Sequence, residues 1–151
     1  MGLNHRRMKQ NGRVHWLGLV ALVGIIGLLV LIAFSGSSPA SAAGAFMTAL
    51  AKGDVDKLTD LTYQGQKTKD QIQKDWDFTV HKASPYYRFT WQMKDEHFMS
   101  DKEATVKMDL YRNLGPSSYP EHFELPLQKV DGKWKIRVES INREMYPFLP
   151  H

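Results

Sequence analysis

The sequence contains no cysteine, and before position 54 it contains no acidic residue. The first absence excludes disulfides, thiolate nucleophiles and cysteine-based metal sites. The second places the formal net charge of +4 in the N-terminal tail, through Arg6, Arg7, Lys9 and Arg13. In the rest of the chain the other basic residues balance the 16 Asp and Glu residues, so nothing favours a nucleic-acid partner.

Multidomain architectures are excluded by the length of 151 residues, which makes room for one small domain and an appendage. A fully disordered chain is excluded by composition, because 42% hydrophobic and 11% aromatic residues are enough to build a core.

Residues 16–34 form an apolar run without charge or proline. A helix of this length spans roughly 28 Å, close to the hydrocarbon thickness of a bilayer. We therefore predict a cytoplasmic basic tail at 1–13 and a single transmembrane helix at 14–34. Because the basic residues lie only upstream, the remainder of the chain is expected outside the cytoplasm.

A cleaved signal peptide is the alternative interpretation of this run. Ala40-Ser41-Ala42 is an A-x-A-like cleavage site that follows a basic segment and an apolar segment. The apolar run is longer than the 7–15 residues usual for a signal peptide, which favours an uncleaved anchor.

Small residues recur within the predicted span at Gly18, Ala21, Gly24 and Gly27. A row without bulky side chains lets another helix approach closely, so these four residues are helix-packing candidates. Ordinary transmembrane glycine content is the alternative explanation. His15, at the start of the span, has no partner ligand in view, and a hydrated histidine in the headgroup region is the simpler interpretation than metal or pigment ligation.

The predicted extracytoplasmic part consists of a Ser/Gly/Pro linker at 35–41 and one domain at 42–151. Helical spacing of apolar residues predicts helices over 41–52 and 55–63, separated by a stop at Gly53. Thr68 and Gln71 fit a capping box that opens a third helix.

After Pro85 the apolar period changes to two. Strands are predicted at 87–93, 104–110, 123–127 and 134–138. Asp131-Gly132 predicts a hairpin turn, and Pro126 predicts an edge or a bulge in its strand. Trp134 is expected on the buried face with Ile136 and Val138, with Lys133 and Lys135 toward solvent. Helices followed by an antiparallel sheet indicate the α+β class.

Two stretches carry a family likeness. AAGAFMTALAKGDVDKLTDLT at 42–62 resembles the opening helix pair of nuclear transport factor 2-like (cystatin-like cone) domains. FELPLQKVDGKWKI at 123–136 resembles the closing hairpin of the small bacterial membrane-anchored branch. The resemblance implies about three helices packed on a curved antiparallel sheet of about four strands, with a conical pocket, in a protein of the bacterial inner (cytoplasmic) membrane.

Aromatic residues and one histidine are the candidates for lining that cone: Tyr63, Trp76, Tyr87, Trp91, His97 and Tyr111. Core packing explains the aromatic ones without chemistry. Asp75 and Asp77 have no spacing that pairs them with a base, and the histidines His81, His97, His122 and His151 are scattered singly. We therefore expect no catalytic, cofactor-binding or metal site.

Two functional hypotheses remain. The first is a non-enzymatic, membrane-anchored accessory or scaffolding subunit of a larger membrane complex of respiratory, photosynthetic or secretion type, with the lipid bilayer and other membrane protein subunits as partners. The second is an extracytoplasmic protein that binds a small apolar ligand in the cone. An open, aromatic-lined cavity would favour the second hypothesis, and side chains filling the cone would favour the first.

Overall fold

The computed structural model describes residues 38–112 and 118–151. The chain divides into two units, 1–36 and 37–151, and the described residues belong to the second. The predicted tail, the transmembrane helix and the four small residues at 18, 21, 24 and 27 lie outside the described residues. Within residues 38–112 and 118–151 no helix has the length and apolar character that a membrane crossing needs.

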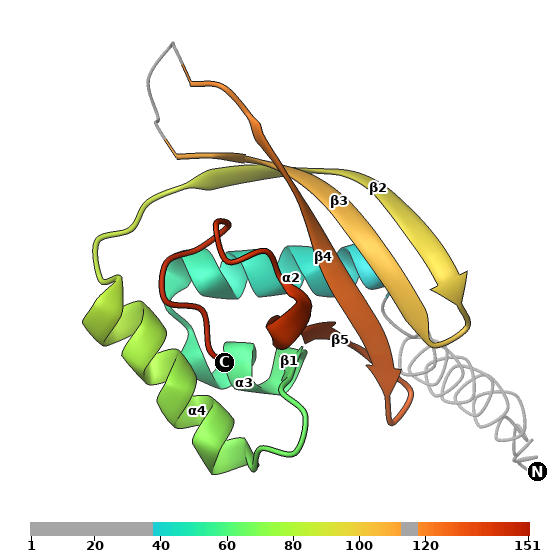
Figure 1. Ribbon diagram of the computed structural model, residues 1–151, viewed down its shortest axis with the longest axis horizontal. Coiled ribbons are helices and arrows are strands. Elements are labelled where there is room, and N and C mark those ends of the chain that lie inside the picture. The colour runs from blue at the N-terminus through green and yellow to red at the C-terminus, as the bar shows by residue number, and fades with distance from the viewer. Residues whose placement is uncertain (1–37, 113–117) are drawn as a thin grey trace, which may run out of the picture. The chain divides into compact units, whose positions relative to one another are not determined.

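Helix α2, Pro39–Lys52, runs along the sheet (Figure 1). The Ser38 side chain accepts a hydrogen bond from the Ser41 backbone N–H, and proline occupies the first turn, where its missing N–H costs nothing. The helix ends at Gly53, whose φ of 68° is a left-handed cap. The linker prediction of 35–41 is therefore too long, because this N-cap and the proline begin the helix at Pro39.

Two shorter helices follow, α3, Val55–Leu61, and α4, Lys69–Asp77. The Thr68–Gln71 capping box is present with both of its reciprocal hydrogen bonds, as predicted. Beyond α4 the chain continues as the π-helix η1, Phe78–Ala83, which the apolar spacing does not predict. Its widened turn brings Val80 and His81 against Gly53 at the end of α2.

The sheet contains five strands in the order β1-β5-β4-β3-β2. Their bounds are β1, Thr62–Tyr63; β2, Thr90–Ser100; β3, Glu103–Tyr111; β4, Glu121–Val130; and β5, Lys133–Arg137. The α+β class is confirmed. The expected four-stranded antiparallel sheet is wrong in one respect, because β1 pairs in parallel with β5 and makes the sheet mixed. A strand of two residues is too short for a periodic signal.

Two turns lie at one end of the sheet. Asp131 and Gly132 both have positive φ, 50° and 78°, as the predicted hairpin turn requires. The turn between β2 and β3 follows a register shift between Phe98 and Ser100. Pro126 lies just beyond the last pair between β4 and β5, Leu127 with Ile136, so β4 has a free edge there as expected.

The core lies between α2 and the inner face of the sheet. Trp134 and Ile136 are buried and Lys133 is exposed, which confirms the predicted register, although Lys135 is half-buried. The C-terminal segment 138–151 begins with the short 3-10 helix η2, Val138–Ser140, and returns on the same side of the sheet as the helices (Figure 1).

Candidate functional site

The interior of the cone is filled by side chains. The core includes Phe46 and Met47 of α2 and Met108 and Leu110 of β3, each of which is at most 1% exposed. The C-terminal segment adds Met145, which is fully buried. These residues form one contiguous hydrophobic core with both the helices and the sheet. An interior packed in this way holds the domain together by burial.

The sequence-predicted cone residues occupy different places. Trp76 is fully buried, its ring makes an edge contact with Phe46 at 5.9 Å, and its indole N–H donates to Thr62 Oγ1 at 3.0 Å. The interpretation of Trp76 as a core residue is confirmed. His97 is exposed on β2, away from the core. The others are half-buried: Tyr63, Tyr87, Trp91 and Tyr111.

An aromatic cluster closes one side of the core. The rings of Tyr87 and Tyr146 meet edge to face at 4.9 Å, and Phe89 packs against both at 5.8 and 5.9 Å. Burial raises the pKa of both tyrosine hydroxyls, so they remain protonated at neutral pH. Their geometry is that of packed rings, for which offset and edge contacts are preferred.

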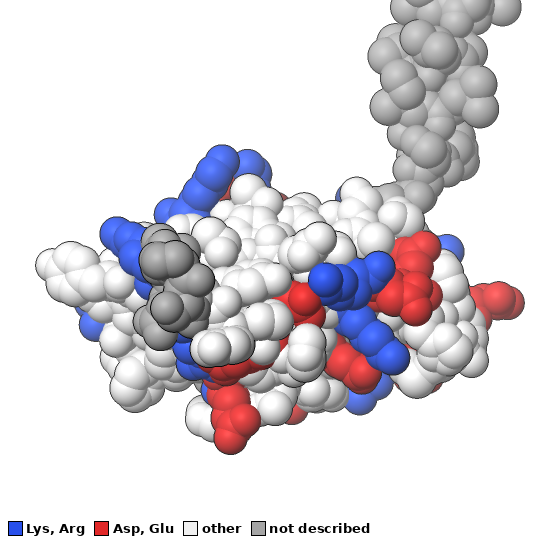
Figure 2. Space-filling view, turned by 90° about the horizontal axis from the view of Figure 1, so that it is seen from above, with Lys and Arg blue, Asp and Glu red and all other residues white. Residues whose placement is uncertain are grey.

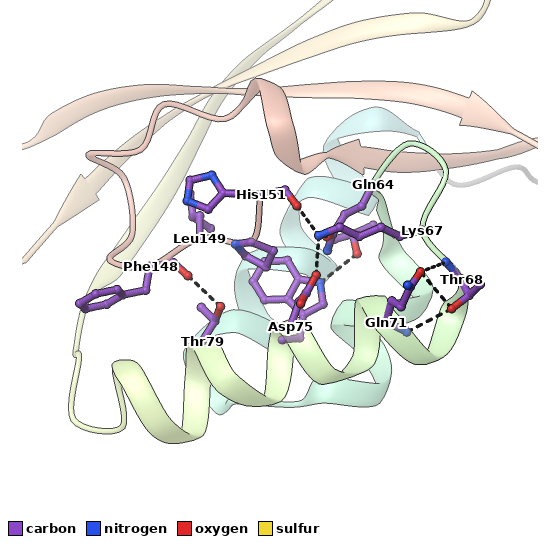
Figure 3. Close-up of polar contacts among 12 residues, drawn as sticks. Gln64, Lys67, Thr68, Gln71, Asp75, Thr79, Phe148, Leu149 and His151 are labelled. Carbon is purple, nitrogen blue, oxygen red and sulfur yellow. Dashed lines mark hydrogen bonds and ion pairs between the residues drawn. The ribbon is translucent and has the colours of Figure 1, made fainter.

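Asp75 and Asp77 are each engaged by a separate partner. The Lys67 ammonium forms an ion pair with Asp75, with 2.5 Å between Lys67 Nζ and Asp75 Oδ2. The same ammonium also donates to Gln64 Oε1 and to the His151 carbonyl oxygen (Figure 3). Asp77 pairs with His81 Nδ1 at 2.8 Å on the next turn. The two carboxylates therefore form separate structural contacts, in agreement with their lack of a shared base.

A polar cluster on the outer face of the sheet joins three neighbouring strands. Asp109 of β3 is buried, with Lys94 Nζ of β2 at 2.9 Å and His122 Nδ1 of β4 at 2.7 Å. The three residues line a groove of about 660 Å³ with Glu124 and Asn142. In Figure 2 acidic and basic side chains lie beside one another on the face that is visible there.

The chemistry of this cluster is that of an ion-pair network. The hydrogen bond from Lys94, followed by that from His122, lowers the pKa of the Asp109 carboxyl. The same carboxylate raises the pKa of Lys94. A general base functions best with a pKa near the working pH, so a carboxylate held strongly ionised is poorly suited to abstract protons. Among the described residues no three His, Asp or Glu side chains are grouped to hold a metal ion.

Sequence reasoning missed the Asp109 cluster. It interpreted His122 as a single histidine, whereas the structure pairs it with Asp109 across adjacent strands. Alternation within β3 and β4 places both residues on the outward face. Alternation does not specify the register that brings them opposite each other.

A second surface exposes aromatic side chains. Phe78, Tyr86 and Phe148 are 57%, 86% and 66% exposed, and we call them the aromatic surface. Phe148 has a φ of 57°, a conformation that costs a residue with a bulky side chain energy. Its carbonyl oxygen accepts from Thr79 Oγ1 of η1 at 2.8 Å, which ties the strained segment to the π-helix (Figure 3).

The described residues thus define a small α+β domain whose cone is filled and whose polar contacts link neighbouring elements. The chain belongs to the family described as "Protein of unknown function (DUF2950)", whose family model matches residues 34–147. No curated protein matches the chain.

Several solved structures are similar. An NTF-2 like protein of unknown function from Shewanella oneidensis MR-1 is 15% identical, with 63% of this chain and 88% of that chain covered and a TM-score of 0.44. A ketosteroid isomerase-like protein from Erwinia carotovora atroseptica SCRI1043 is 15% identical, with 63% of this chain and 85% of that chain covered and a TM-score of 0.45. A calcium/calmodulin-dependent protein kinase type II association domain from Thiobacillus denitrificans ATCC 25259 is 12% identical, with 67% of this chain and 90% of that chain covered and a TM-score of 0.49. With identities of 12–15% and TM-scores below 0.5, these likenesses carry no argument about the fold family or the activity of this chain.

Proposed function

We propose that the protein is a non-enzymatic, single-pass membrane-anchored accessory or scaffolding subunit of a larger membrane complex. The observation that carries the proposal is the filled cone. Phe46, Met108 and Met145 occupy the space in which a small apolar ligand would have to bind. Because side chains fill this space, an interaction module is favoured over the ligand-binding alternative.

The aromatic surface supports the same proposal. Exposed aromatic residues are enriched where proteins contact one another, and three of them gather around η1 and the C-terminal segment. Phe148 has a strained backbone conformation, and its ring is exposed to solvent. The ring therefore gains little from packing within the domain. Strain held at an exposed position points to a role outside the fold.

The first experiment tests membrane anchoring and membership of a complex. We expect the full chain to stay with bacterial membranes after alkaline carbonate washing, and gentle detergent extraction to recover it with other membrane subunits. Replacing Gly24 and Gly27 together with leucine preserves insertion, because it only raises hydrophobicity, and weakens co-purification if a partner helix packs on the small-residue row. Wild-type recovery of this double variant would assign the contacts to the outer domain.

The second experiment separates function from stability. Phe148→Gly removes the ring and relieves the positive φ, so the free energy of unfolding stays the same or rises by up to about 1 kcal/mol. Co-purification with the complex nevertheless falls. Asp131→Gly is the matched control, because it also relieves a positive φ but lies in the turn between β4 and β5. A Phe148→Gly variant that co-purifies like the control would contradict a contact role for the aromatic surface.

A further inference from the structure

A second apolar group lies at the turn between β2 and β3. Phe98 and Met99 are adjacent in the sequence and are 52% and 57% exposed. The register shift between Phe98 and Ser100 leaves Met99 as the extra residue of a bulge, a feature that redirects side chains. We call Phe98 and Met99 the hairpin tip.

The hairpin tip lies beside the start of α2. The Ala40 backbone N–H donates to Glu96 Oε2 at 3.1 Å, and Glu96 precedes Phe98 by two residues on β2. The Phe98 ring also contacts the Trp134 ring edge to face at 6.0 Å. In Figure 1 the turn between β2 and β3 and the first turn of α2 are on the same side of the domain, and η1 is on the other.

The chain that precedes α2 limits how far the hairpin tip can be from a bilayer. The apolar run ends at Phe34, and the α2 N-cap is Ser38. Four residues reach at most about 14 Å when fully extended. If the proposed span ends at Phe34, this chain length allows the start of α2, and the hairpin tip beside it, to reach the membrane surface.

The aromatic surface does not share this position. Helix α2 has 14 residues, which corresponds to a length of about 21 Å. The π-helix η1 packs at its far end, where Val80 and His81 lie against Gly53. The aromatic surface is thus about one helix length farther from the tether than the hairpin tip.

We propose that the hairpin tip inserts into the membrane interface and gives the domain a second attachment to the bilayer. This inference rests on the proposed membrane anchor. Charges in the two neighbouring turns balance, because Lys102, Lys129 and Lys133 accompany Asp101, Glu103 and Asp131. Apolar burial drives the insertion, with the lysine ammonium groups able to reach the headgroups.

Two side chains provide only weak attachment by themselves. Tethering makes the second contact intramolecular, so the high effective concentration of the hairpin tip at the surface sustains the contact. The domain then keeps a fixed orientation, with the hairpin tip toward the lipid and the aromatic surface free for a partner.

The test uses the full chain in phosphatidylcholine vesicles. Because the protein has no cysteine, Met99→Cys creates one unique site for an environment-sensitive fluorophore. We expect its emission to shift to shorter wavelength, lipids with a nitroxide near the headgroup to quench it, and aqueous iodide to quench it poorly. Tyr86→Cys on the aromatic surface is the matched control, and its label stays accessible to iodide.

A second labelled variant checks the cause of the insertion. With the label at Ser100→Cys, adding Met99→Asp returns the emission to that of a label in water, because a charge opposes insertion while the exposed Met99 contributes little to folding. Adding anionic lipid or salt is expected to leave the signal of the Met99→Cys label unchanged. A requirement for anionic lipid would contradict apolar insertion.

Other outcomes overturn the proposal in distinguishable ways. If carbonate washing strips the chain from the vesicles, the membrane anchor fails and the insertion fails with it. If the chain is retained but the Met99 label is as accessible to iodide as the Tyr86 label, only the insertion fails. Shielding in native membranes but not in pure lipid would assign the hairpin tip to a protein partner instead.

Discussion

The two faces of the sheet are built from the same strands but are maintained by different interactions. On the inner face of β3, Val106, Met108 and Leu110 are at most 1% exposed and are held by packing against α2. On the outer face Asp109 joins Lys94 and His122 through ion pairs. Packing is non-directional and insensitive to pH, whereas the outer contacts depend on geometry and charge. A single strand therefore stabilises its two faces by separate means.

The largest expected effect comes from the inner face. Trp134→Ala removes a ring that is 7% exposed and that packs against Phe98 and beneath the Lys129 ammonium. We expect the free energy of unfolding to fall by about 3–5 kcal/mol, as measured by urea titration of the full chain in detergent. His97→Ala on the outer face is the control and should change stability by less than about 0.5 kcal/mol. Equal losses would mean that the faces do not differ in this way.

A smaller effect is expected from the buried polar pair formed by Thr62 of β1 and Trp76 of α4. Thr62 Oγ1 accepts from the Trp76 indole and donates to the Leu58 carbonyl oxygen at 2.6 Å. Thr62→Val keeps the shape but leaves the indole N–H without this partner, so stability should fall by about 1–3 kcal/mol, as measured by the same urea titration. Thr62→Ser retains the hydroxyl and should recover part of that loss. If valine is tolerated as well as serine, shape alone maintains the inner face.

The stability that the outer-face ion pairs contribute should depend on pH. The lowered pKa of the Asp109 carboxyl means that the ionised group stabilises the fold at pH values above its ordinary pKa of 3.8. This contribution is lost as the pH falls through the folded-state pKa. Asp109→Asn should therefore be less stable than the wild type at neutral pH, and the difference should shrink on acidification below about pH 4. Denaturation at both pH values measures this, with the exposed Glu124→Gln as the control. A difference that is constant with pH would show that Asp109 acts by packing alone.

Local signals predicted much of the fold. The Thr68–Gln71 capping box and the Asp131-Gly132 turn are encoded in short stretches of sequence, and the structure has both. Alternation placed Trp134 inward, because a slip of one residue would have exposed every apolar side chain of that strand.

Features that depend on distant segments escaped prediction. The pairing of Thr62 with Ile136 and the burial of Met145 and Leu149 connect parts of the chain without a shared local period. The Asp109–His122 contact requires the register between two strands, which alternation within each strand leaves open. Of the candidate site, the sequence therefore predicted the core role of Trp76 and missed the outer polar cluster.

The parallel pairing of β1 with β5 constrains the order in which parts of the domain can fold. Strand β1 is synthesised early, but the neighbour that completes it lies near the end of the described chain. A nascent chain emerging N-terminus first can form α2 to α4, and α2 can then pack on β2, β3 and β4, but β1 stays unpaired until β5 is synthesised. Long-range closure of this kind slows folding and lengthens the interval in which the chain is open to chaperones or to misassociation.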